Sequence, residues 1–596
     1  MKKLILPIAL FFLLAAIWPT AWAENQPSIK IQVQGISDPL KGKIMNMLAG
    51  RSQALPTPLT EESIKRFYKE STTYVRTGLE PYGYFEPQIS TNLYHSGNTW
   101  TMTYSINTGP VIRITHVDLK ISGGGAADPA FIALYQTIPV KVGQSLNVDN
   151  YQKAKDALFN LAADRGYFSA KMSLSQIVIN KNNRQASIIL HFDTGPRYRF
   201  GETLFPPSDL NSKFLQKFLR YKQGDYYSSE LVQKTQQVLA GSGYFTQTIV
   251  TPLPNQAQNY QVPIKIELTP VKPQTYTFGL GYGTDTGPRG TLGFNWIPVN
   301  SYGHHINVLA RGSYINVKGS ARQNNNINAS YIIPGSDPAT DFYTINTGYG
   351  NIVQETGKAN SFKTSISYST RFDRSWQEVL ALTYLDENYQ LPGTPYILAN
   401  VLYPNGHWQY TYNLSSHQQI VDNGISGSFD VAGATKAVIS KTDFLQGKLG
   451  IKALGTFDPT NTRFLFHGAV GQTVVGKNEL DNIPLTLQLF AGGPTTIRGY
   501  KYNSIGPGRN LVIASGEIQQ KVYSNWYIAG FLDSGAVSGS DASINNNFNG
   551  RYLFGAGAGA VLLTPIGSVE VSLARPVFDP RNGKTWQLEF SVGTEL

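Results

Sequence analysis

The stretch TWQLEFSVGTEL, residues 585–596, alternates between apolar and polar side chains. Successive side chains of a β-strand point to opposite faces of the sheet, so this stretch predicts one apolar face and one polar face. The apolar face carries Trp586, Leu588, Phe590, Val592 and Leu596, and the polar face carries Gln587, Glu589 and Ser591. Strands of a transmembrane β-barrel have this pattern, with apolar side chains toward lipid and polar side chains toward the lumen. We therefore expect the carboxylate of Glu589 to face a polar lumen.

Strands of the same kind begin near residue 274. The stretch TYTFGLGYG, residues 275–283, places aromatic and aliphatic side chains on one face and threonine and glycine on the other. Residues 305–313, 361–370 and 408–412 alternate in the same way. A soluble sheet with one wet face would show this alternation too, but the aromatic content of 12% favours a membrane barrel with aromatic belts. At about 9–11 residues for each membrane strand, residues 274–596 accommodate sixteen antiparallel strands with their turns.

Composition restricts the partners and sites that the chain can have. The 596 residues include no cysteine, which excludes disulfides, thiolate metal sites, a cysteine nucleophile and a lipidated N-terminal cysteine. The formal net charge of +11 is spread along the chain without a dense Lys/Arg run, so we expect no nucleic-acid partner. A solvated charged surface is the simpler interpretation, and contact with anionic lipid head groups is the alternative.

Motifs of common catalytic sites are missing from the sequence. The eight histidines have no metal-binding spacing such as H-E-x-x-H, and neither a G-x-S-x-G turn nor a phosphate-binding loop occurs. We therefore expect no enzymatic activity and no metal or cofactor.

The N-terminus has the three parts of a secretory signal peptide. Lys2 and Lys3 precede an apolar run at residues 4–18, and Ala21 and Ala23 form an A-x-A cleavage site. Small residues at these two positions favour cleavage after Ala23 over a retained signal anchor. No later run of about 18 apolar residues is present, so we expect that any membrane domain is a barrel.

A local pattern occurs three times between the signal peptide and the expected barrel. A helical stretch ends at a glycine, an aromatic pair follows and a strand begins, in YGYFEPQIS, RGYFSAKMSL and SGYFTQTIV. Gly83, Gly166 and Gly243 each suit the position after a helix, where the backbone angle φ becomes positive. Periodicity around each copy predicts the element order β-α-α-β-β. We expect three α+β units, at residues 24–109, 110–195 and 196–273, followed by an all-β domain at residues 274–596.

A long segment between the eleventh and twelfth expected strands, residues 476–510, exceeds a plain turn, and loops of this length are usually functional. It contains AGGPTTIRGY, residues 491–500, with Arg498 near its end. Downstream, FLDSG places Asp533 on a strand face that should line the lumen, because a carboxylate facing lipid is costly. The planar guanidinium of Arg498 matches a carboxylate, although a solvated loop arginine is the alternative.

The two segments resemble the (V/I)RG(F/Y) and FxDxG signatures of the BamA superfamily of outer-membrane assembly proteins. In that family the loop folds back into the barrel, and its arginine pairs with the aspartate of the inner wall. The resemblance implies a loop motif of Gly492, Gly493, Ile497, Arg498, Gly499 and Tyr500. It implies a lumenal partner motif of Phe531, Asp533 and Gly535, and Glu517 on the inner face of the neighbouring strand is a second expected contact.

The three α+β units resemble the POTRA domains of the same superfamily, and three such units before a sixteen-stranded barrel resemble its TamA branch. Three generic α+β modules are the alternative. The resemblance implies an outer-membrane location in a two-membrane bacterium, with the POTRA domains in the periplasm. It implies insertion or secretion of β-barrel proteins such as autotransporters. The partners implied are a TamB-like periplasm-spanning protein, client outer-membrane β-barrel proteins, and membrane lipid with lipopolysaccharide.

Three other functions remain open on the sequence. A BamA-type general assembly protein carries five POTRA units, and a two-partner secretion transporter carries two with an N-terminal plug helix. A passive outer-membrane channel is the alternative of another class. Glycine weakens strand pairing, so the first and last strands are expected to form a weak seam. The seam residues are Tyr276, Gly279, Gly281, Gly283, Gly593 and Leu596.

Overall fold

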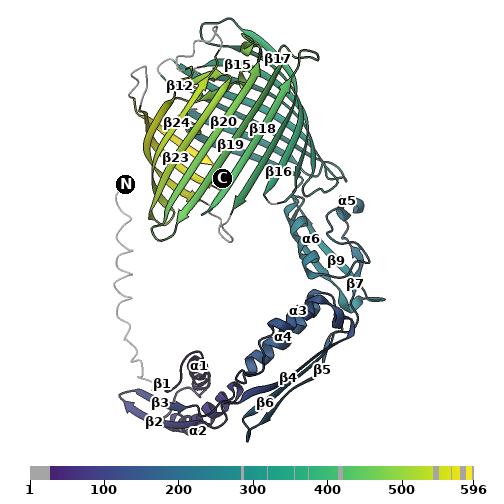
Figure 1. Cartoon of the computed structure of the whole chain (residues 1–596), viewed down its shortest axis with the longest axis vertical. Helices are drawn as coiled ribbons and strands as arrows, with labels where there is room; N and C mark the ends of the chain where they lie inside the picture. The colour runs from purple at the N-terminus through teal and green to yellow at the C-terminus, as the bar shows by residue number, and fades with distance from the viewer. Residues whose placement is uncertain are drawn as a thin grey trace, which may run out of the picture. The chain divides into compact units, whose positions relative to one another are not determined.

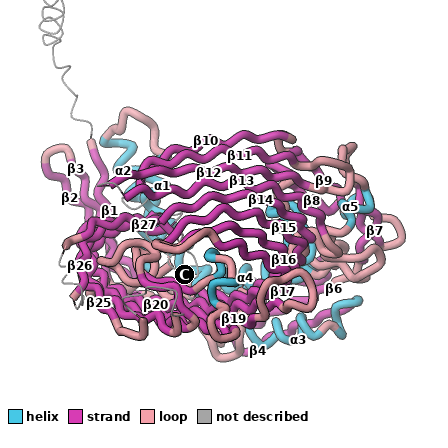
Figure 2. Tube along the Cα trace, turned by 90° about the horizontal axis from the view of Figure 1, so that it is seen from above, coloured by secondary structure: helices cyan, strands magenta, loops and turns pink. Residues whose placement is uncertain are grey.

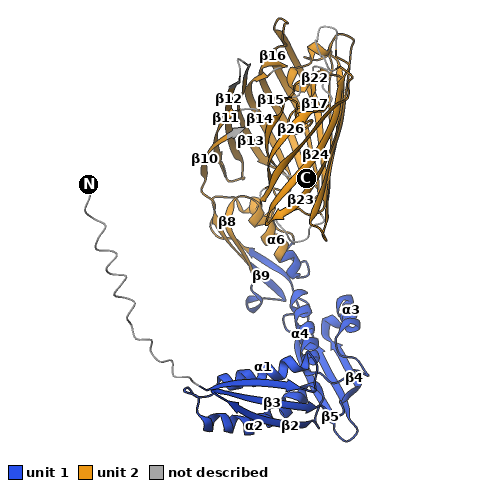
Figure 3. Ribbon diagram, turned by 90° about the vertical axis from the view of Figure 1, so that its left-hand side faces the viewer, with its two compact units in different colours: residues 1–203, 221–232, 252–264 blue, residues 204–220, 233–251, 265–596 orange. Residues whose placement is uncertain are grey.

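The computed structural model describes residues 27–283, 287–317, 320–354, 356–373, 375–413, 421–540, 549–564, 567–577 and 585–593. The expected signal peptide, residues 1–23, and the seam residue Leu596 lie outside the described residues. No helix in the described ranges combines the length and the hydropathy needed to cross a bilayer. The chain divides into two compact units, and the division passes through the third α+β domain (Figure 3).

The first domain has the predicted β-α-α-β-β order. Its elements are β1 (Ser28–Gln34), α1 (Leu40–Gln53), α2 (Glu61–Leu79), β2 (Gln88–Ser96) and β3 (Thr99–Asn107). The central strand β3 pairs in parallel with β1 and antiparallel with β2. Helix α2 begins at a capping box, in which Thr60 and Ser63 each accept a hydrogen bond from the other's backbone amide. Its buried face packs Ile64, Phe67 and Val75 against the sheet, which explains why this segment is helical.

The second and third domains repeat the order. The second contains β4 (Arg113–Ser122), α3 (Pro129–Thr137), α4 (Val148–Asp164), β5 (Lys171–Asn180) and β6 (Gln185–Asp193). The third contains β7 (Arg199–Leu204), α5 (Ser212–Gln216), α6 (Ser229–Gly241), β8 (Phe245–Pro252) and β9 (Gln261–Pro270). Their sheets have the orders β4–β6–β5 and β7–β9–β8. Gly83, Gly166 and Gly243 have φ values of 85°, 82° and 80°, which is the left-handed conformation that the repeated pattern predicts.

A buried carboxylate holds the two helices of the second domain together. Asp128 is 6% exposed and caps α3 by accepting a hydrogen bond from the Ala130 amide at 3.0 Å. Arg165 Nε and the Tyr167 hydroxyl donate to its other oxygen at 2.7 and 3.0 Å. Burial by itself would raise the pKa of Asp128, but these three hydrogen bonds outweigh it and hold the pKa below its ordinary value.

Replacing Asp128 by asparagine should destabilise the second domain at neutral pH by about 1.5–3 kcal/mol, because charge-assisted hydrogen bonds are lost. A pKa that is lower in the folded state gives stability above the unfolded-state pKa, and this stability is lost as the pH falls. The difference between the wild type and D128N should therefore shrink below about pH 4. Urea unfolding at pH 7 and at pH 3, monitored by hydrogen exchange of the α3 and α4 amides, measures this difference in stability. The exposed Asp156 on α4 provides a control, D156N. An equal loss at both pH values would contradict the ionic role of Asp128.

The remaining domain is a sixteen-stranded antiparallel sheet whose strands follow one another in chain order and curve into a barrel (Figures 1 and 2). Eleven strands precede the long loop: β10 (Gln274–Gly283), β11 (Gly287–Trp296), β12 (His305–Val317), β13 (Ser320–Pro334), β14 (Phe342–Gln354), β15 (Gly357–Arg371), β16 (Trp376–Gln390), β17 (Ile397–Asn413), β18 (Gly424–Ala434), β19 (Phe444–Phe457) and β20 (Thr462–Val475). Five strands follow it: β23 (Asn510–Tyr523), β24 (Trp526–Ser538), β25 (Leu553–Thr564), β26 (Gly567–Pro576) and β27 (Gln587–Gly593). The predicted fold class is confirmed.

The two faces of the barrel wall differ as the alternation predicts. Outward side chains such as Phe278 and Leu532 are 79% and 55% exposed, as apolar residues on a lipid-facing surface should be. Inward polar residues lie in a packed lumen, where Asp533 is 1% and Glu589 is 5% exposed. This packed lumen is the setting of the long loop.

Candidate functional site

The long loop connects β20, which ends at Val475, to β23, which begins at Asn510. It contains two short 3₁₀ turns, η4 (Leu480–Asn482) and η5 (Leu485–Leu487). A small antiparallel pair, β21 (Leu489–Ala491) and β22 (Ile505–Gly508), brackets the Arg498 motif. The motif therefore sits at the tip of a hairpin that enters the barrel.

The paired glycines of the motif form a tight turn. Gly492 and Gly493 have φ values of 104° and 100°, and the Gly492 amide donates to Thr496 Oγ1 at 2.8 Å. L-residues with side chains rarely adopt such angles, so the turn needs glycine. After the turn, Ile497 and Tyr500 are buried with Val537 and Leu553 of the barrel wall. These two apolar contacts place Arg498 against the wall.

Arg498 makes a bidentate interaction with Asp533 on β24. Its Nε and Nη2 atoms donate to the two carboxylate oxygens of Asp533 at 2.8 and 2.9 Å, and its own backbone amide donates to Asp533 Oδ2 at 2.9 Å. Arg498 is 6% exposed, so the pair is shielded from water. Ser515 on β23, which lies opposite Asp533 in the ladder, donates to Asp533 Oδ1 at 2.6 Å. The carboxylate is thus held by the wall as well as by the loop.

Two more carboxylates complete the surroundings of the guanidinium. Arg498 Nη1 donates to Glu517 on β23 at 2.5 Å and to Glu570 on β26 at 3.1 Å. The flat face of the guanidinium lies over the ring of Phe531, with the guanidinium carbon 3.4 Å from the ring centroid. A single loop side chain therefore contacts three barrel strands. A fixed set of this kind is best suited to holding the loop in register, since a buried ion pair adds little net stability.

Backbone glycines make room for the tip. A Cβ atom at Gly555 on β25 would clash with the carbonyl oxygen of Arg498. A Cβ at Gly499 would lie 2.6 Å from the backbone carbon of Arg575 on β26, and Gly499 also has a positive φ of 89°. At Gly535, a Cβ would lie 2.9 Å from Ile497. The loop and the wall approach each other backbone to backbone, which only glycine permits.

Comparison with protein families identifies the domains of the chain. The model of the Omp85 superfamily domain matches residues 307–596. The model of the POTRA domain called TamA domain 1 matches residues 30–108, and a POTRA model described as a surface antigen variable number repeat matches residues 201–270. The barrel domain belongs to the Omp85 superfamily. The chain is an outer-membrane protein with N-terminal POTRA domains in the periplasm.

Individual relatives of this Omp85 protein are distant. The outer membrane protein assembly factor BamA of Buchnera aphidicola is 21% identical over 174 residues, which are 29% of this chain and 28% of that protein. The chain thus matches little more than a quarter of that relative. The structure of BamA from Haemophilus ducreyi lacking POTRA domains 1–3 has a TM-score of 0.66 and 17% identity, over 80% of this chain and 99% of that chain. CdiB from Acinetobacter baumannii has a TM-score of 0.47, with 15% identity, over 81% and 90% of the two chains.

The leading arm of the Omp85 loop has a second anchor, on the strands that precede it. Glu387 on β16 is fully buried and accepts hydrogen bonds from the Thr486 amide and hydroxyl at 3.2 and 2.8 Å. Gln488 donates to the carbonyl of Ile483 at 2.8 Å, which fixes the turn internally. Three loop side chains, Leu480, Ile483 and Leu485, belong to a buried cluster with residues of β15–β19. The loop is therefore attached to two separate parts of the wall.

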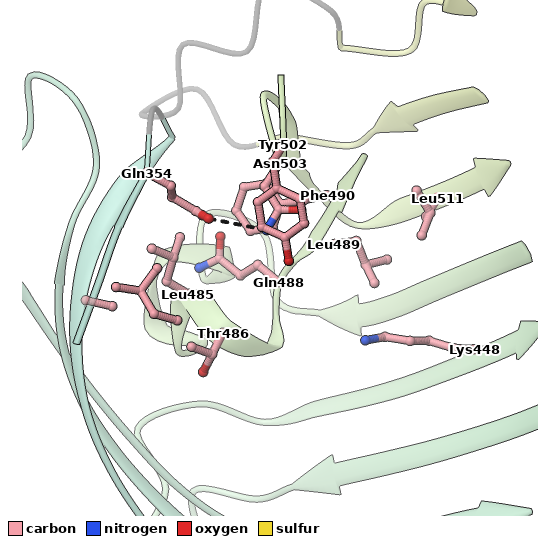
Figure 4. Close-up of a pocket in the computed structure, with 12 residues that line it drawn as sticks. Gln354, Lys448, Leu485, Thr486, Gln488, Leu489, Phe490, Tyr502, Asn503 and Leu511 are labelled. Atoms are coloured by element: carbon pink, nitrogen blue, oxygen red, sulfur yellow. Dashed lines mark hydrogen bonds between the residues drawn. The ribbon is translucent and has the colours of Figure 1, made fainter. Parts of the chain in front are cut away.

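A cavity of about 350 Å³ lies beside this leading arm (Figure 4). Lys448 projects into it from β19, and Tyr502 and Asn503 close it from the loop. Asn503 donates to Gln354 of β14 at 3.3 Å, which adds a third strand region to the loop's contacts. The cavity shows that the loop does not fill this part of the lumen.

The predicted seam lies at the two ends of the sheet. Within the part of the chain that the structure describes, β10 pairs only with β11, and β27 only with β26. Tyr276, Gly279, Gly281 and Gly283 lie on β10, and Gly593 pairs with Ser568 at the end of the β26–β27 ladder. Tyr276 is 62% exposed and its ring lies 5.3 Å from that of Phe294.

Sequence reasoning brought together Arg498, Asp533, Glu517 and Phe531, which the structure places in one cluster. It missed Glu570, Gly555 and Glu387. The first two had usable signals: Glu570 is the only acid in the alternating strand SVEVSLARP, and Gly555 begins the inward glycine series of LFGAGAGAV. Glu387 had none, because nothing in the local sequence around it points to a partner about a hundred residues away.

Proposed function

We propose that this protein is a TamA-like assembly factor that inserts or secretes β-barrel proteins, such as autotransporters, at the outer membrane. The observation that carries the proposal is the loop tip anchored on β23, β24 and β26, a few strands from the end of the sheet. The match of the first domain to the TamA POTRA type supports the TamA branch. We further propose a signal peptide at residues 1–23, POTRA domains at residues 24–109, 110–195 and 196–273, and a barrel from residue 274.

The proposed mechanism uses the two end strands of the sheet. Strands β10 and β27 each have a backbone edge that carries no ladder among the described residues. Free edges of this kind accept a further strand through backbone hydrogen bonds. A client strand would add to one of these edges and pass toward lipid, while the anchored loop keeps the remaining wall in register. Assembly of this kind needs no covalent chemistry, metal or cofactor, so the protein is proposed to act as a non-enzymatic factor.

The proposed partners follow from the two parts of the chain. The POTRA sheets have edge strands, such as β2 of the first domain, that suit strand addition by client proteins in the periplasm. A TamB-like protein is the proposed periplasmic partner, on the basis of the TamA-type first domain. Lipid and lipopolysaccharide would contact the exposed apolar belt of the barrel. A passive channel is the contrasting function, and it would show a conductance or uptake defect on deletion without any assembly defect.

A disulfide across the proposed seam provides the test. Cysteines at Thr277 and Ser591 would join the two end strands, and the chain contains no other cysteine. We expect oxidation to abolish insertion of a client barrel and reduction to restore it, because a closed seam cannot accept a strand. A matched control joins Thr275 to Asn295, which already face each other in the β10–β11 ladder, and should not reduce activity. Full activity of the oxidised seam variant would refute the proposed opening.

A further inference from the structure

The tip of the loop also contacts the last strand of the barrel. The backbone amide of Gly499 donates a hydrogen bond to Glu589 Oε1 on β27 at 2.7 Å. Glu589 is 5% exposed, and its second oxygen, Oε2, has no hydrogen-bond partner among the described residues. The Gly499 bond is therefore the polar contact that this buried carboxylate makes in the described part of the chain. A hydrogen bond of this length between two buried groups is costly to break, because the amide would be left without an acceptor.

Strand β27 needs such a connection more than any strand within the sheet. An interior strand is held by ladders on both edges, whereas β27 has a described ladder only with β26, from Ser568↔Gly593 to Ala574↔Gln587. Glu589 lies in the middle of that ladder, opposite Ser572. A bond at this point ties the centre of β27 to the loop from inside the barrel.

The loop can serve as a support because its own position is already determined. Arg498, the residue before Gly499, is held by Asp533, Glu517 and Glu570. The Gly499 backbone lies against the backbone of Arg575 on β26, so the tip has no room to move sideways. The amide of Gly499 is thus presented to β27 from a fixed point.

We propose that Glu589 is a positioning residue that couples the loop tip to β27, so that release of the loop frees the last strand. The importance of this coupling rests on the proposed opening between β10 and β27. The chemistry required at position 589 is an oxygen acceptor of the correct length. A negative charge is not required, because Asp533, Glu517 and Glu570 already supply three carboxylates to the one guanidinium.

Hydrogen exchange of β27 amides in the full-length protein, reconstituted in lipid nanodiscs, tests the coupling. Glu589→Ala removes the acceptor and should speed exchange across β27 by about tenfold to a hundredfold, the range expected when a buried donor, here the Gly499 amide, loses its acceptor. Glu589→Gln keeps an oxygen at the same reach and should exchange at the wild-type rate. Ser591→Ala, on the same strand and inner face, is the matched control and should also exchange as the wild type does.

Two outcomes would overturn the proposal. The first is exchange of the β27 amides at the wild-type rate in Glu589→Ala. The second is exchange in Glu589→Gln that is as fast as in Glu589→Ala. If Glu589→Ala does not give a folded barrel, Glu589→Asp replaces it, since the shorter side chain withdraws the acceptor but keeps the charge. The seam disulfide separates this coupling from the proposed function. An active oxidised seam variant together with fast exchange in Glu589→Ala would refute the opening of the seam and leave the coupling intact.

Discussion

Replacement of Arg498 by methionine is expected to release the loop tip and abolish assembly activity while the sixteen-stranded barrel still forms. The strands pair through their own ladders, which do not depend on the loop. The buried carboxylates of Asp533 and Glu517, which are 1% and 8% exposed, would lose their cationic partner. Removing one member of a buried pair destabilises a protein by about 3–5 kcal/mol. Unfolding in guanidinium chloride and protease cleavage within residues 476–509 measure the two effects.

Neutral substitutions at the two carboxylates distinguish the effect of releasing the loop from the cost of leaving a buried charge unpaired. Adding Asp533→Asn and Glu517→Gln to R498M should recover most of the lost stability, because neither position then carries a buried negative charge without a cation. Assembly activity should stay low, since the loop remains unanchored. Lys477→Met, which removes an exposed cation of the same loop, serves as the control and should behave as the wild type does. A protease-resistant loop in R498M would contradict the anchoring role of the arginine.

A simple exchange of the two charged residues is a poor test of this pair. Arg498 contacts Glu517 and Glu570 as well as Asp533, so an aspartate at position 498 would face two carboxylates. The exchanged protein would therefore remain impaired even though the original pair is direct. The neutral variants avoid this difficulty because they remove charge without adding repulsion.

Replacement of Gly555 by alanine is expected to expel the loop tip without changing any charge. The added Cβ would meet the carbonyl oxygen of Arg498, and both are backbone-attached positions that cannot rotate apart. Overpacking commonly costs about 1–3 kcal/mol, and here the loop can relieve it by leaving the wall. We expect the same protease sensitivity and loss of assembly as in R498M.

An outward glycine on the adjacent strand controls for the intrinsic effect of alanine in a strand. A Cβ at Gly530 on β24 meets no atom within 4 Å, so G530A should leave the loop and the assembly activity unchanged. Heat-modifiable electrophoretic mobility reports whether each barrel is folded. A G555A variant with a protected loop and full activity would show that the close approach at Gly555 is not needed.

Some parts of the site were predictable because they follow from local rules. Strict alternation places Asp533, Glu517 and Glu570 on the inner wall, and the length of residues 476–510 marks a functional loop. The pairing of Arg498 with Asp533 was implied by the resemblance of the two motifs to the superfamily signatures, and the match of a guanidinium to a carboxylate supported it. The contacts of Glu387 with Thr486 and of Glu589 with Gly499 could not be predicted, because alternation gives the face of a strand and not the point that a loop reaches.

By itself, the sequence determined the β-α-α-β-β units, the facing of the barrel strands and the loop that carries Arg498. Each of these depends on side-chain periodicity or turn chemistry within a few residues, which is written along the chain. The tertiary structure decided that one guanidinium serves three strands, that Gly555 on β25 admits the tip, and that the last strand is tied to the loop through Glu589. These contacts join residues up to 90 positions apart, and their distances are set by the curvature and register of the barrel wall, which no local segment specifies.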